Sequence, residues 1–375
     1  SRGLGDVYKR QLHHECNIKQ VKYMTNILVI NLGSTSSKIG FYQDENCVSM
    51  ETIHHDLNIS QKPLLDQESY RIDSIKSFIK EKTPGMQSID AIACRGGLLK
   101  PIAGGTYTVN SKMYEDLRSF KYGVHASNLS GIIGYKLGEI LNIPVFIVDP
   151  VVVDELIDIA RITGIKDIKR RSVFHALNQK AVARQYAKSI QKPYNKVNVI
   201  VVHMGGGITV GAHLQGKVVD VNEGLYGEGP MSPERAGTIP NDMLYQFGVE
   251  RGYSPEALQH FISKKAGLVN LCSTNNMKQL VNEYSVNKTT HLILDAMIYQ
   301  IAKTIGERAV IFKGDIDQIL LTGGIAHSQL ITDKIQEYVE WIAPVSVYPG
   351  ELEMEALANQ VYEAVNLREE VKIYS

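Results

Sequence analysis

Three charged residues stand where folding can bring them to the edge of a sheet. Arg95 follows the apolar run 89–93 and precedes two glycines, a position from which an arginine can reach a ligand in a cleft. Asp149 ends a second apolar run, and Arg235 lies in the glycine- and proline-rich loop 222–240. Because a guanidinium binds two oxygens of a phosphate or carboxylate at once, this set predicts chemistry on anions. A surface ion pair for Arg95 and a structural role for Asp149 remain open alternatives.

Two turns made of small residues offer a place for phosphate groups. The triple glycine 205–207 follows an apolar strand, and glycines let backbone N–H groups approach an anion closely. The turn 33–34 has the same setting: a strand that ends in a polar residue (Asn31 here, His203 there), then the turn and two further strands. Neither turn has the GxxxxGK[ST] pattern of a P-loop. The repeated order indicates two related domains across a cleft, although an ordinary hairpin turn is the alternative for the triple glycine.

Two histidines near predicted helix starts are further candidates. His125 precedes a predicted helix at 129–141, for which Asn128 is expected to be the N-cap. His175 follows Phe174 and opens a helix that extends to about residue 190. The pattern leaves His175 open between packing and catalysis.

Composition excludes several classes of function. Lys and Arg total 40 and Asp and Glu total 40, so no net charge gathers nucleic acid or an anionic membrane. No apolar run is long enough to cross a bilayer. The four cysteines have neither paired nor metal-type spacing, which fits a reducing cytosol. We therefore expect a cytoplasmic protein, and 375 residues predict two domains.

Residues 1–23 differ from the chain that begins at Met24. They carry charges throughout and lack the apolar core of a signal peptide, so we expect a non-native or disordered extension. Its His13, His14 and Cys16 are expected to be incidental, because a metal site needs a rigid scaffold.

Hydrophobic periodicity predicts strands that alternate with helices in both halves of the chain, which makes the outer part of each sheet parallel. A helix at 290–312 is apolar on more than one face and is expected in a core or a dimer interface. Other helices are expected at 72–81, from Ser111, at 154–162, 242–247, 255–264, 277–284, 328–341 and 353–368.

Nine segments in series carry a resemblance that covers nearly all of the chain from Met24: ILVINLGSTSSKIG, CRGGLLKPIAGGTY, KYGVHASNLSGII, IVDPVVVDE, FHALNQKAVAR, VVHMGGGITVGAH, GEGPMSPERAGTIP, LLTGGIAHS and WIAPVSVYPGELEMEALA. They resemble the acetate and butyrate kinases, within the superfamily of sugar kinases, actin and heat-shock ATPases. The resemblance implies an α/β fold of two duplicated ribonuclease-H-like domains. Each would be a mixed five-stranded sheet flanked by helices, with a cleft between the domains. The expected bounds are 24–190, with part of the C-terminal helix packed back, and 191–375.

The resemblance also implies a role for particular residues. It places the phosphates of ATP or ADP at Gly33, Ser34, Gly205, Gly206 and Gly207, with His203 as a phosphate contact and Gly323, Gly324 and Ile325 at the adenosine. It places Asn31 and Glu353 beside Mg²⁺, Arg95 and Arg235 on either side of the transferred group, and Asp149 at the acyl end of the substrate.

One position departs from the acetate kinase pattern. Acetate kinases have a second catalytic histidine at the end of their FHGTSH stretch, where this chain has Gln179. An amide donates a hydrogen bond to a phosphoryl oxygen but brings no charge, so more of the neutralisation is expected from Arg95, Arg235 and Mg²⁺. His175 keeps the first histidine of that stretch, in a catalytic or a structural role.

The implied reaction is the reversible transfer of a phosphoryl group from ATP to a short-chain carboxylate, which forms an acyl phosphate. The sequence favours butyrate, with isobutyrate, propionate and acetate as alternatives. A carboxylate is ionised near neutral pH, so the reaction needs no general base. Closure of the two lobes around a hinge near 190–197 and assembly into a homo-oligomer, a dimer or higher, are also expected. The alternative from another class is a non-enzymatic nucleotide-binding protein like actin, for which the Arg95, Asp149 and Arg235 set has no use.

Overall fold

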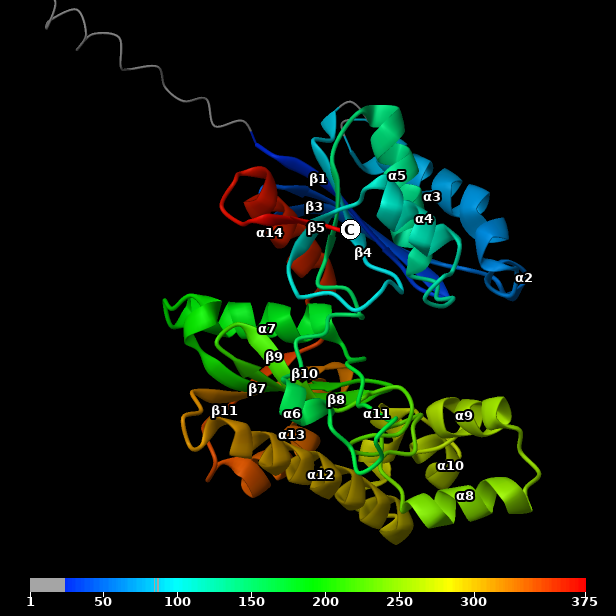
Figure 1. Ribbon diagram of the computed structural model, residues 1–375, viewed down its shortest axis with the longest axis vertical. Helices are drawn as coiled ribbons and strands as arrows, with labels where there is room; N and C mark the ends of the chain where they lie inside the picture. Colours follow the sequence, from blue (N-terminus) through cyan, green and yellow to red (C-terminus); the bar gives the residue numbers. More distant parts are fainter. Residues whose placement is uncertain (1–23, 84, 86–87) are drawn as a thin grey trace, which may run out of the picture.

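The computed structural model describes residues 24–83, 85 and 88–375, and their strands form two sheets, one in each of two lobes (Figure 1). The extension 1–23 lies outside the described residues, and so do His13, His14 and Cys16. No helix of the described part is long and apolar enough to cross a membrane.

The first sheet contains seven of the described strands, two more than expected. In spatial order they are β12 (Val371–Ile373), β5 (Thr106–Thr108), β6 (Val145–Val148), β4 (Ala91–Arg95), β1 (Asn26–Leu32), β2 (Ser36–Gln43) and β3 (Asn46–His54). The expectation of five strands is corrected here because β5 and β12 add to the edge beyond β6. Each has only three residues, too few to show an alternation of apolar and polar positions.

The second sheet has the five expected strands. They are β11 (Val345–Pro349), β10 (Gln318–Gly323), β7 (Asn198–Met204), β8 (Ile208–Leu214) and β9 (Lys217–Val221). In both sheets a three-stranded antiparallel unit is followed by two parallel strands, so β3-β2-β1-β4-β6 corresponds to β9-β8-β7-β10-β11. This repeated order confirms the predicted duplication of an α/β unit.

Helices cover both faces of the first sheet. On one face lie α3 (Glu68–Lys82), α4 (Ser111–Arg118) and α5 (Asn128–Leu141); on the other lies α14 (Glu353–Val365), and the short α2 (Leu57–Ser60) and η1 (Leu64–Gln67) precede α3. Gly134 and Gly138 of α5 let the helix approach the side chains of Cys94 and Val145, because a Cβ at either glycine would overlap them. The capping prediction was wrong: Ser127 precedes α5, and Asn128 lies in its first turn.

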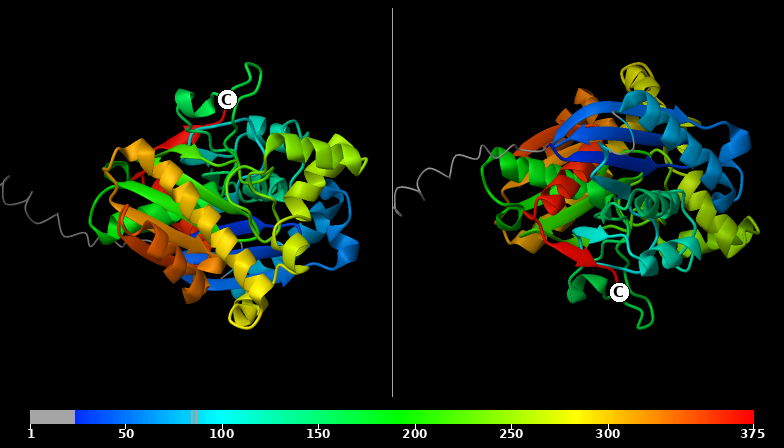
Figure 2. Two further views of the ribbon diagram at one scale, coloured as in Figure 1. Left: turned by 90° about the horizontal axis from the view of Figure 1, so that it is seen from below. Right: turned by 90° about the horizontal axis from the view of Figure 1, so that it is seen from above.

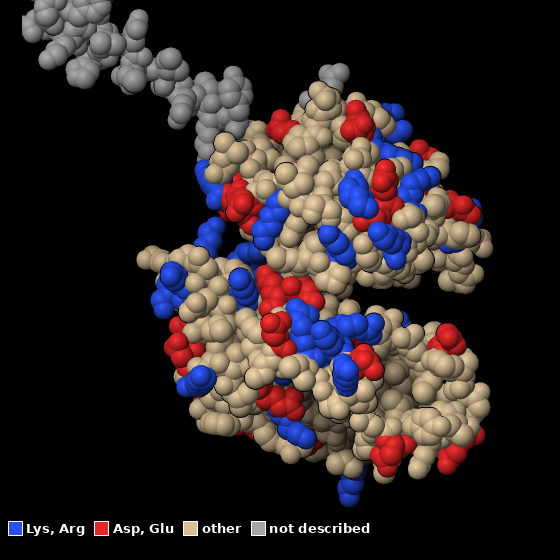
Figure 3. Space-filling model, viewed as in Figure 1, with Lys and Arg blue, Asp and Glu red and all other residues tan. Residues whose placement is uncertain are grey.

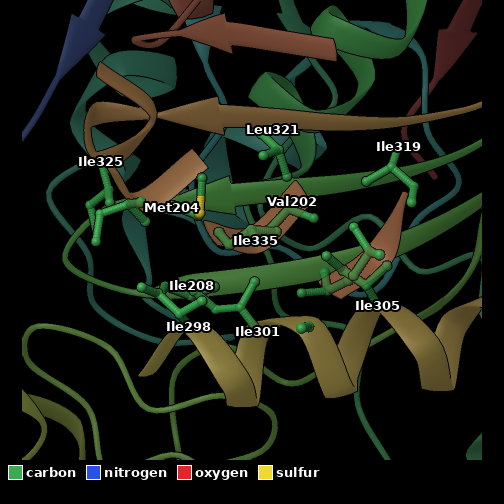
Figure 4. Packing of buried hydrophobic residues seen from close by; sticks show 14 of the residues in the cluster. Val202, Met204, Ile208, Ile298, Ile301, Ile305, Ile319, Leu321, Ile325 and Ile335 are labelled. Atoms are coloured by element: carbon green, nitrogen blue, oxygen red, sulfur yellow. The ribbon is translucent and has the colours of Figure 1, made fainter. Parts of the chain in front are cut away.

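The second sheet is covered by α7 (Ala176–Ser189) on one face and by α12 (Lys288–Ala309) and α13 (Gln329–Val339) on the other. Ile298, Ile301 and Ile305 of α12 pack against the sheet with Val202 and Leu321 (Figure 4). The predicted burial of this helix is confirmed for its sheet-facing side. The remaining elements are α6 (Asp158–Arg161), η3 (Tyr194–Lys196), α8 (Asn241–Glu250), α9 (Pro255–Lys264), α10 (Leu268–Cys272), α11 (Met277–Glu283), η4 (Val310–Phe312) and η5 (Gly324–His327).

Two helices join the lobes. The C-terminal segment returns to the first lobe, where α14 packs on β1, β4 and β6 and β12 pairs with β5 (red in Figures 1 and 2). Helix α7, which the expected boundary at 190 places with the first domain, packs between the two sheets. Its Leu177 shares a core with α14 of the first lobe, and its Val182, Ala183 and Tyr186 share a core with Val199 and Val201 of β7.

Candidate active site

The molecule is hollowed between the two lobes (Figure 3), and a pocket of about 490 Å³ lies there. Six of the residues predicted from sequence line this one pocket: Arg95, His125, Asp149, His175, Arg235 and Glu353. They come from the ends of β4 and β6, the segment before α5, the start of α7, the loop after β9 and the start of α14. Segments that lie far apart in the sequence therefore converge on the same cleft, at the carboxyl ends of the parallel strands.

Arg95, Asn31 and Glu353 form one polar cluster. The Asn31 amide donates from Nδ2 to Glu353 Oε2 at 2.8 Å, and Arg95 Nη1 lies 3.2 Å from the same oxygen. Arg95 Nη1 also donates to Asn31 Oδ1 at 3.4 Å. Glu353 is buried and lies in the first turn of α14, where the positive end of the helix dipole stabilises a carboxylate.

This cluster is a small donor set for a metal ion. Among the described residues, no group of three or more His, Cys, Asp or Glu side chains gathers as a metal cage. One buried carboxylate and one amide oxygen fit Mg²⁺ that arrives with a nucleotide, since Mg²⁺ keeps several waters and takes its other ligands from substrate phosphates. The residues present therefore fit the predicted metal in that form.

Two imidazoles stack in the cleft. The rings of His175 and His203 lie 3.8 Å apart between centroids, with an interplanar angle of 12°. Burial lowers the pKa of His203 to about 4, and burial, His203 and the two nearby arginines hold the pKa of His175 well below its ordinary value. Both rings are therefore neutral at pH 7.

The triple glycine forms a tight turn in which Gly205 N–H bonds to the carbonyl of Gly207 at 3.0 Å. The loop after β9 lies on this turn, because the carbonyl of Gly206 accepts from Ser232 Oγ at 2.7 Å. A Cβ at Gly207 would overlap the guanidinium of Arg235. Arg235 is held by the carbonyl of Gly224, and burial lowers the pKa of its guanidinium. The glycine turn and the arginine predicted beside it thus form one unit.

None of the predicted turns, at 33–34, 205–207 and 323–325, belongs to the pocket lining. Gly323 ends β10 with φ of 91° and sits so close to Met204 of the neighbouring strand that a Cβ would overlap its backbone. Gly324 and Ile325 follow in η5, and a Cβ at Gly324 would meet no atom within 4 Å. This open backbone at the end of β10 leaves room for a flat ligand group.

In the first lobe, the turn with Gly33 and Ser34 is held from behind by a residue that the sequence reading missed. Arg71 of α3 is fully buried and donates to the carbonyl of Gly33 at 3.1 Å and to Ser37 Oγ at 2.8 Å. The carbonyls of Ser34 and Ser36 lie within 3.5 Å and 3.4 Å of its guanidinium. The only sequence signal was an arginine among apolar positions of a helix.

Two predicted catalytic residues have different surroundings from those expected. Asp149 borders the pocket, but both its carboxylate oxygens are engaged, one by Gly105 N–H at 2.7 Å and one by Arg184 at 2.6 Å. Burial acts to raise the pKa of Asp149, and the charges of Arg184 and Lys180 outweigh it, so the pKa lies below its ordinary value. The carboxylate is therefore an ionised, fixed group.

Gln179 is fully buried and does not line the pocket. Its amide nitrogen donates to Thr209 Oγ1 at 2.8 Å and to the Thr209 carbonyl at 3.0 Å. The expectation that this amide donates to a phosphoryl oxygen is not met in this geometry. The sequence shows that Gln179 lies close to His175 along the chain. It does not show where the amide points, because that depends on Thr209 of strand β8.

Several polar residues of the lining were not predicted as site residues: Ser127, Thr209, Tyr226, Glu256, Gln259, His260, Ser263 and Lys264. Apolar side chains form a further part of the pocket wall and were not predicted either. They are Leu98, Val124, Val148, Pro150, Val151, Val173, Phe174, Ala176, Leu177 and Leu225. Sequence patterns do not separate such residues from ordinary core positions, because both are apolar and lie next to buried strands.

Comparison with known proteins places this arrangement in a family. The model of the acetokinase family matches residues 158–345. Two proteins named probable butyrate kinase, from Clostridium botulinum strains Eklund 17B / Type B and Alaska E43 / Type E3, are each 48% identical over 351 residues, which is 93% of this chain and 99% of their own length.

Solved structures share the fold. An acetate kinase from Porphyromonas gingivalis superposes with a TM-score of 0.73 at 16% identity, over 91% of this chain and 100% of that one. A propionate kinase from Francisella tularensis superposes with a TM-score of 0.69 at 18% identity, over 90% and 99%. With its sequence relatives, its family match and its duplicated lobes in agreement, this chain belongs to the acetokinase family.

Proposed function

We propose that this protein transfers the terminal phosphoryl group of ATP to a short-chain carboxylate, with butyrate as the preferred substrate, and that it also runs in the ATP-forming direction. The observation that carries the proposal is the composition of one pocket. It joins two arginines, Arg95 and Arg235, to a wall of apolar side chains. Such a pocket suits a molecule with an anionic head and a short hydrocarbon tail.

The proposed step is a direct in-line displacement. A carboxylate oxygen attacks the terminal phosphorus, the bond from that phosphorus to the bridging oxygen breaks, and ADP leaves with the bridging oxygen. The carboxylate is already ionised, so no proton is transferred. Arg95 and Arg235 place two permanent positive charges beside the pocket, where they offset the repulsion between two anions and align them.

Asn31 and Glu353 would hold Mg²⁺ on the nucleotide side of Arg95. The ion supplies charge neutralisation of the phosphates when it is bound. We propose the turns at 33–34 and 205–207 as the phosphate sites, with His203, which lies next to the second turn, as a further contact. We propose the Gly323-Gly324-Ile325 backbone as the adenosine site, because it is open.

The apolar wall supports selection by chain length. Each methylene placed in an apolar pocket contributes about 1–3 kcal/mol of discrimination, so neighbouring acids are expected to react more slowly and not to be excluded. Propionate, isobutyrate and acetate remain alternative substrates. We also propose that the protein acts in the cytoplasm as a homo-oligomer, which analytical ultracentrifugation tests.

Hydroxylamine trapping of the acyl phosphate tests the proposal. The assay contains Mg-ATP with acetate, propionate, butyrate, isobutyrate or valerate. We expect kcat/KM to peak at butyrate and to fall at least about 100-fold in Arg95→Ala and Arg235→Ala, as for other lost transition-state donors. Arg251→Ala serves as the control, because Arg251 is an exposed arginine at the end of α8. A peak at acetate would refute the butyrate preference, and no acyl phosphate from any acid would refute the function.

A further inference from the structure

A chain of buried hydrogen bonds runs from the start of the second sheet to His175. Tyr194 Oη lies 2.8 Å from His213 Nδ1, and His213 Nε2 lies 3.0 Å from Gln179 Oε1. Gln179 Nε2 lies 2.8 Å from Thr209 Oγ1, which lies 2.9 Å from His175 Nδ1. The middle members His213, Gln179 and Thr209 have no exposed surface. Each contact in this chain joins one group that donates to one that accepts.

A backbone carbonyl determines which group donates and which accepts in each of these hydrogen bonds. Gln179 Nε2 also lies 3.0 Å from the carbonyl oxygen of Thr209, and a carbonyl only accepts. The amide NH₂ must therefore face Thr209, and Oε1 must face His213. It follows that His213 Nε2 carries the proton and that His213 Nδ1 accepts from the Tyr194 hydroxyl.

The same direction continues to the cleft. Since the second amide proton of Gln179 is donated to Thr209 Oγ1, the threonine hydroxyl is free to donate its own proton to His175 Nδ1. A neutral His175 then carries its proton on Nε2. His175 lines the pocket, and its Nε2 has no hydrogen-bond partner among the described residues. The chain thus ends in an N–H donor at the pocket.

A glycine in the middle of β8 makes room for this arrangement. Gly211 is buried, and a Cβ there would overlap Gln179 Oε1 and approach His213 Nε2 at 3.3 Å. Glycine weakens the interior of a strand, so its presence marks a close approach by another group. Here the approaching group is the side chain that sets the direction of the chain.

The second stacked imidazole has a separate anchor. Asn178 Oδ1 accepts from Leu352 N–H at 2.9 Å, so its NH₂ faces His203 Nδ1 at 2.8 Å. His203 is thereby also protonated on Nε2, through a set of bonds that does not include Thr209. This independence makes His203 an internal reference for any experiment on His175.

We propose that Gln179 and Thr209 are positioning residues that hold His175 as a neutral imidazole with its Nε2–H aimed at the transferred phosphoryl group. The inference rests on the proposed function and extends it, because it assigns the residue that replaces a family histidine. Arg95, Arg235 and Lys264 already line the pocket, and a further cation beside them would be costly to bury. A neutral donor adds a hydrogen bond to the phosphoryl oxygens without that cost.

Histidine ¹⁵N spectra of the ligand-free enzyme test the inference, because protonated and unprotonated ring nitrogens have distinct shifts. We expect Nε2–H for His175 and His203 in the unaltered protein. Thr209→Val removes the donor with little change of shape, and the Nε2–H signature of His175 should be lost while that of His203 remains. Thr209→Ser should restore it. Thr304→Val is the matched control, since this buried hydroxyl of α12 bonds only to the carbonyl of Gln300 in its own helix.

Turnover adds a second measurement. We expect kcat for acyl phosphate formation to fall about 10- to 100-fold in Thr209→Val and to recover in Thr209→Ser, with KM for the acid nearly unchanged. A His175 protonated on Nδ1, or a His175 spectrum that Thr209→Val leaves unchanged, would overturn the inference. The spectra need no substrate. If the proposed hydrogen bonds to His175 are wrong, the spectra show it. If the proposed function is wrong, the unaltered enzyme forms no acyl phosphate.

Discussion

Arg235 crosses the triple-glycine turn so closely that Gly207 has no room for a methyl group. The glycine is therefore needed for the passage of the arginine, and the proposed approach of a phosphate to the backbone would be a second reason. Its neighbour Gly206 is less constrained, because a Cβ there would lie 3.3 Å from the carboxyl carbon of Glu234. Two glycines of the same turn therefore differ in how much space a side chain would have.

We predict that Gly207→Ala lowers kcat/KM about as much as Arg235→Ala, at least about 100-fold, because the added Cβ displaces the guanidinium. The measurement is acyl phosphate formation, with circular dichroism to show that the fold is retained. Gly306→Ala on α12, where a Cβ meets no atom within 4 Å, is the control and should keep full activity. An active Gly207→Ala variant would show that Arg235 does not need this position.

Single residues also show which features of the site could be predicted from the sequence. Arg95 and Asp149 were predictable because each ends an apolar strand, and both border the pocket. The partner of Asp149 was not, because Arg184 lies on α7 and meets the carboxylate only when the lobes are assembled. Gln179 was noticed by its type, but its direction depends on a carbonyl of β8. Residue type and strand position predict a location, whereas hydrogen-bond direction needs the fold.

At the scale of elements, the turn after β1 depends on a helix that follows it in the sequence. Arg71 of α3 draws the carbonyls of Gly33 and Ser36 toward the protein interior. No acidic side chain of the described part forms a salt bridge with this arginine, and burial lowers its pKa. Because none of these side chains neutralises it, the positive charge of Arg71 behind the turn favours the binding of an anion at the turn.

We predict that Arg71→Met raises KM for ATP about 10-fold or more and changes KM for the acid much less, because the turn loses its anchor and the charge behind it. The unsatisfied carbonyls should also cost about 1–3 kcal/mol of stability. Steady-state kinetics and urea unfolding measure the two effects. Arg118→Met on α4, which removes an exposed pair with Glu68, is the control. Equal changes in both KM values would contradict a role confined to the nucleotide side.

Elements differ in how well the sequence predicts them. The two three-strand units and α12 were predicted because their apolar patterns are long and regular. Strand β12 was missed because three residues carry no pattern, and its partner β5 lies far away in the sequence. The contacts of α7 with both sheets were not predictable, because an apolar helix face does not reveal which sheet it covers.

At the scale of the whole molecule, His55, His203 and His213 are buried and His175 is half-buried, and all four are held neutral in the described part of the chain. Burial lowers the pKa of His55 and of His203 to about 4, and it holds those of His175 and His213 well below the ordinary value. An unfolded chain binds protons on these rings near pH 6.5, whereas the native state does not. Their contribution to stability is thus complete above about pH 6.5 and is lost as the pH falls toward 4.

We predict that the urea midpoint falls between pH 7 and pH 5.5, with each such histidine contributing up to about 1.4 kcal/mol per pH unit in that window. His55→Gln should reduce the dependence of the free energy of unfolding on pH by the equivalent of up to one proton. His54→Gln, at the exposed neighbouring position, should leave this dependence unchanged. The pKa of Asp149 is also lowered, as is usual for a carboxylate paired with a cation, and the stability that it contributes is lost only below its ordinary pKa, outside this window. Equal midpoints at both pH values would refute the prediction.

The two lobes meet mainly through α7 and α14, and the site residues come from both sides of that contact. Arg95 and Glu353 belong to the first lobe, and Arg235 to the second. A nucleotide and an acid bound between them would draw these charges together, and closure would exclude water from the acyl phosphate.

We predict that an ATP analogue with Mg²⁺ and butyrate lowers the radius of gyration in solution scattering, because the two lobes close on the ligands. Each ligand alone should produce a smaller change, because only both together bridge the two arginines. In Arg235→Ala the ternary change should shrink toward that of the nucleotide alone, since the second lobe has lost its contact. An unchanged radius with both ligands bound, at concentrations where binding is shown by calorimetry, would mean that the site is already assembled in the form described here and that no closure accompanies the reaction.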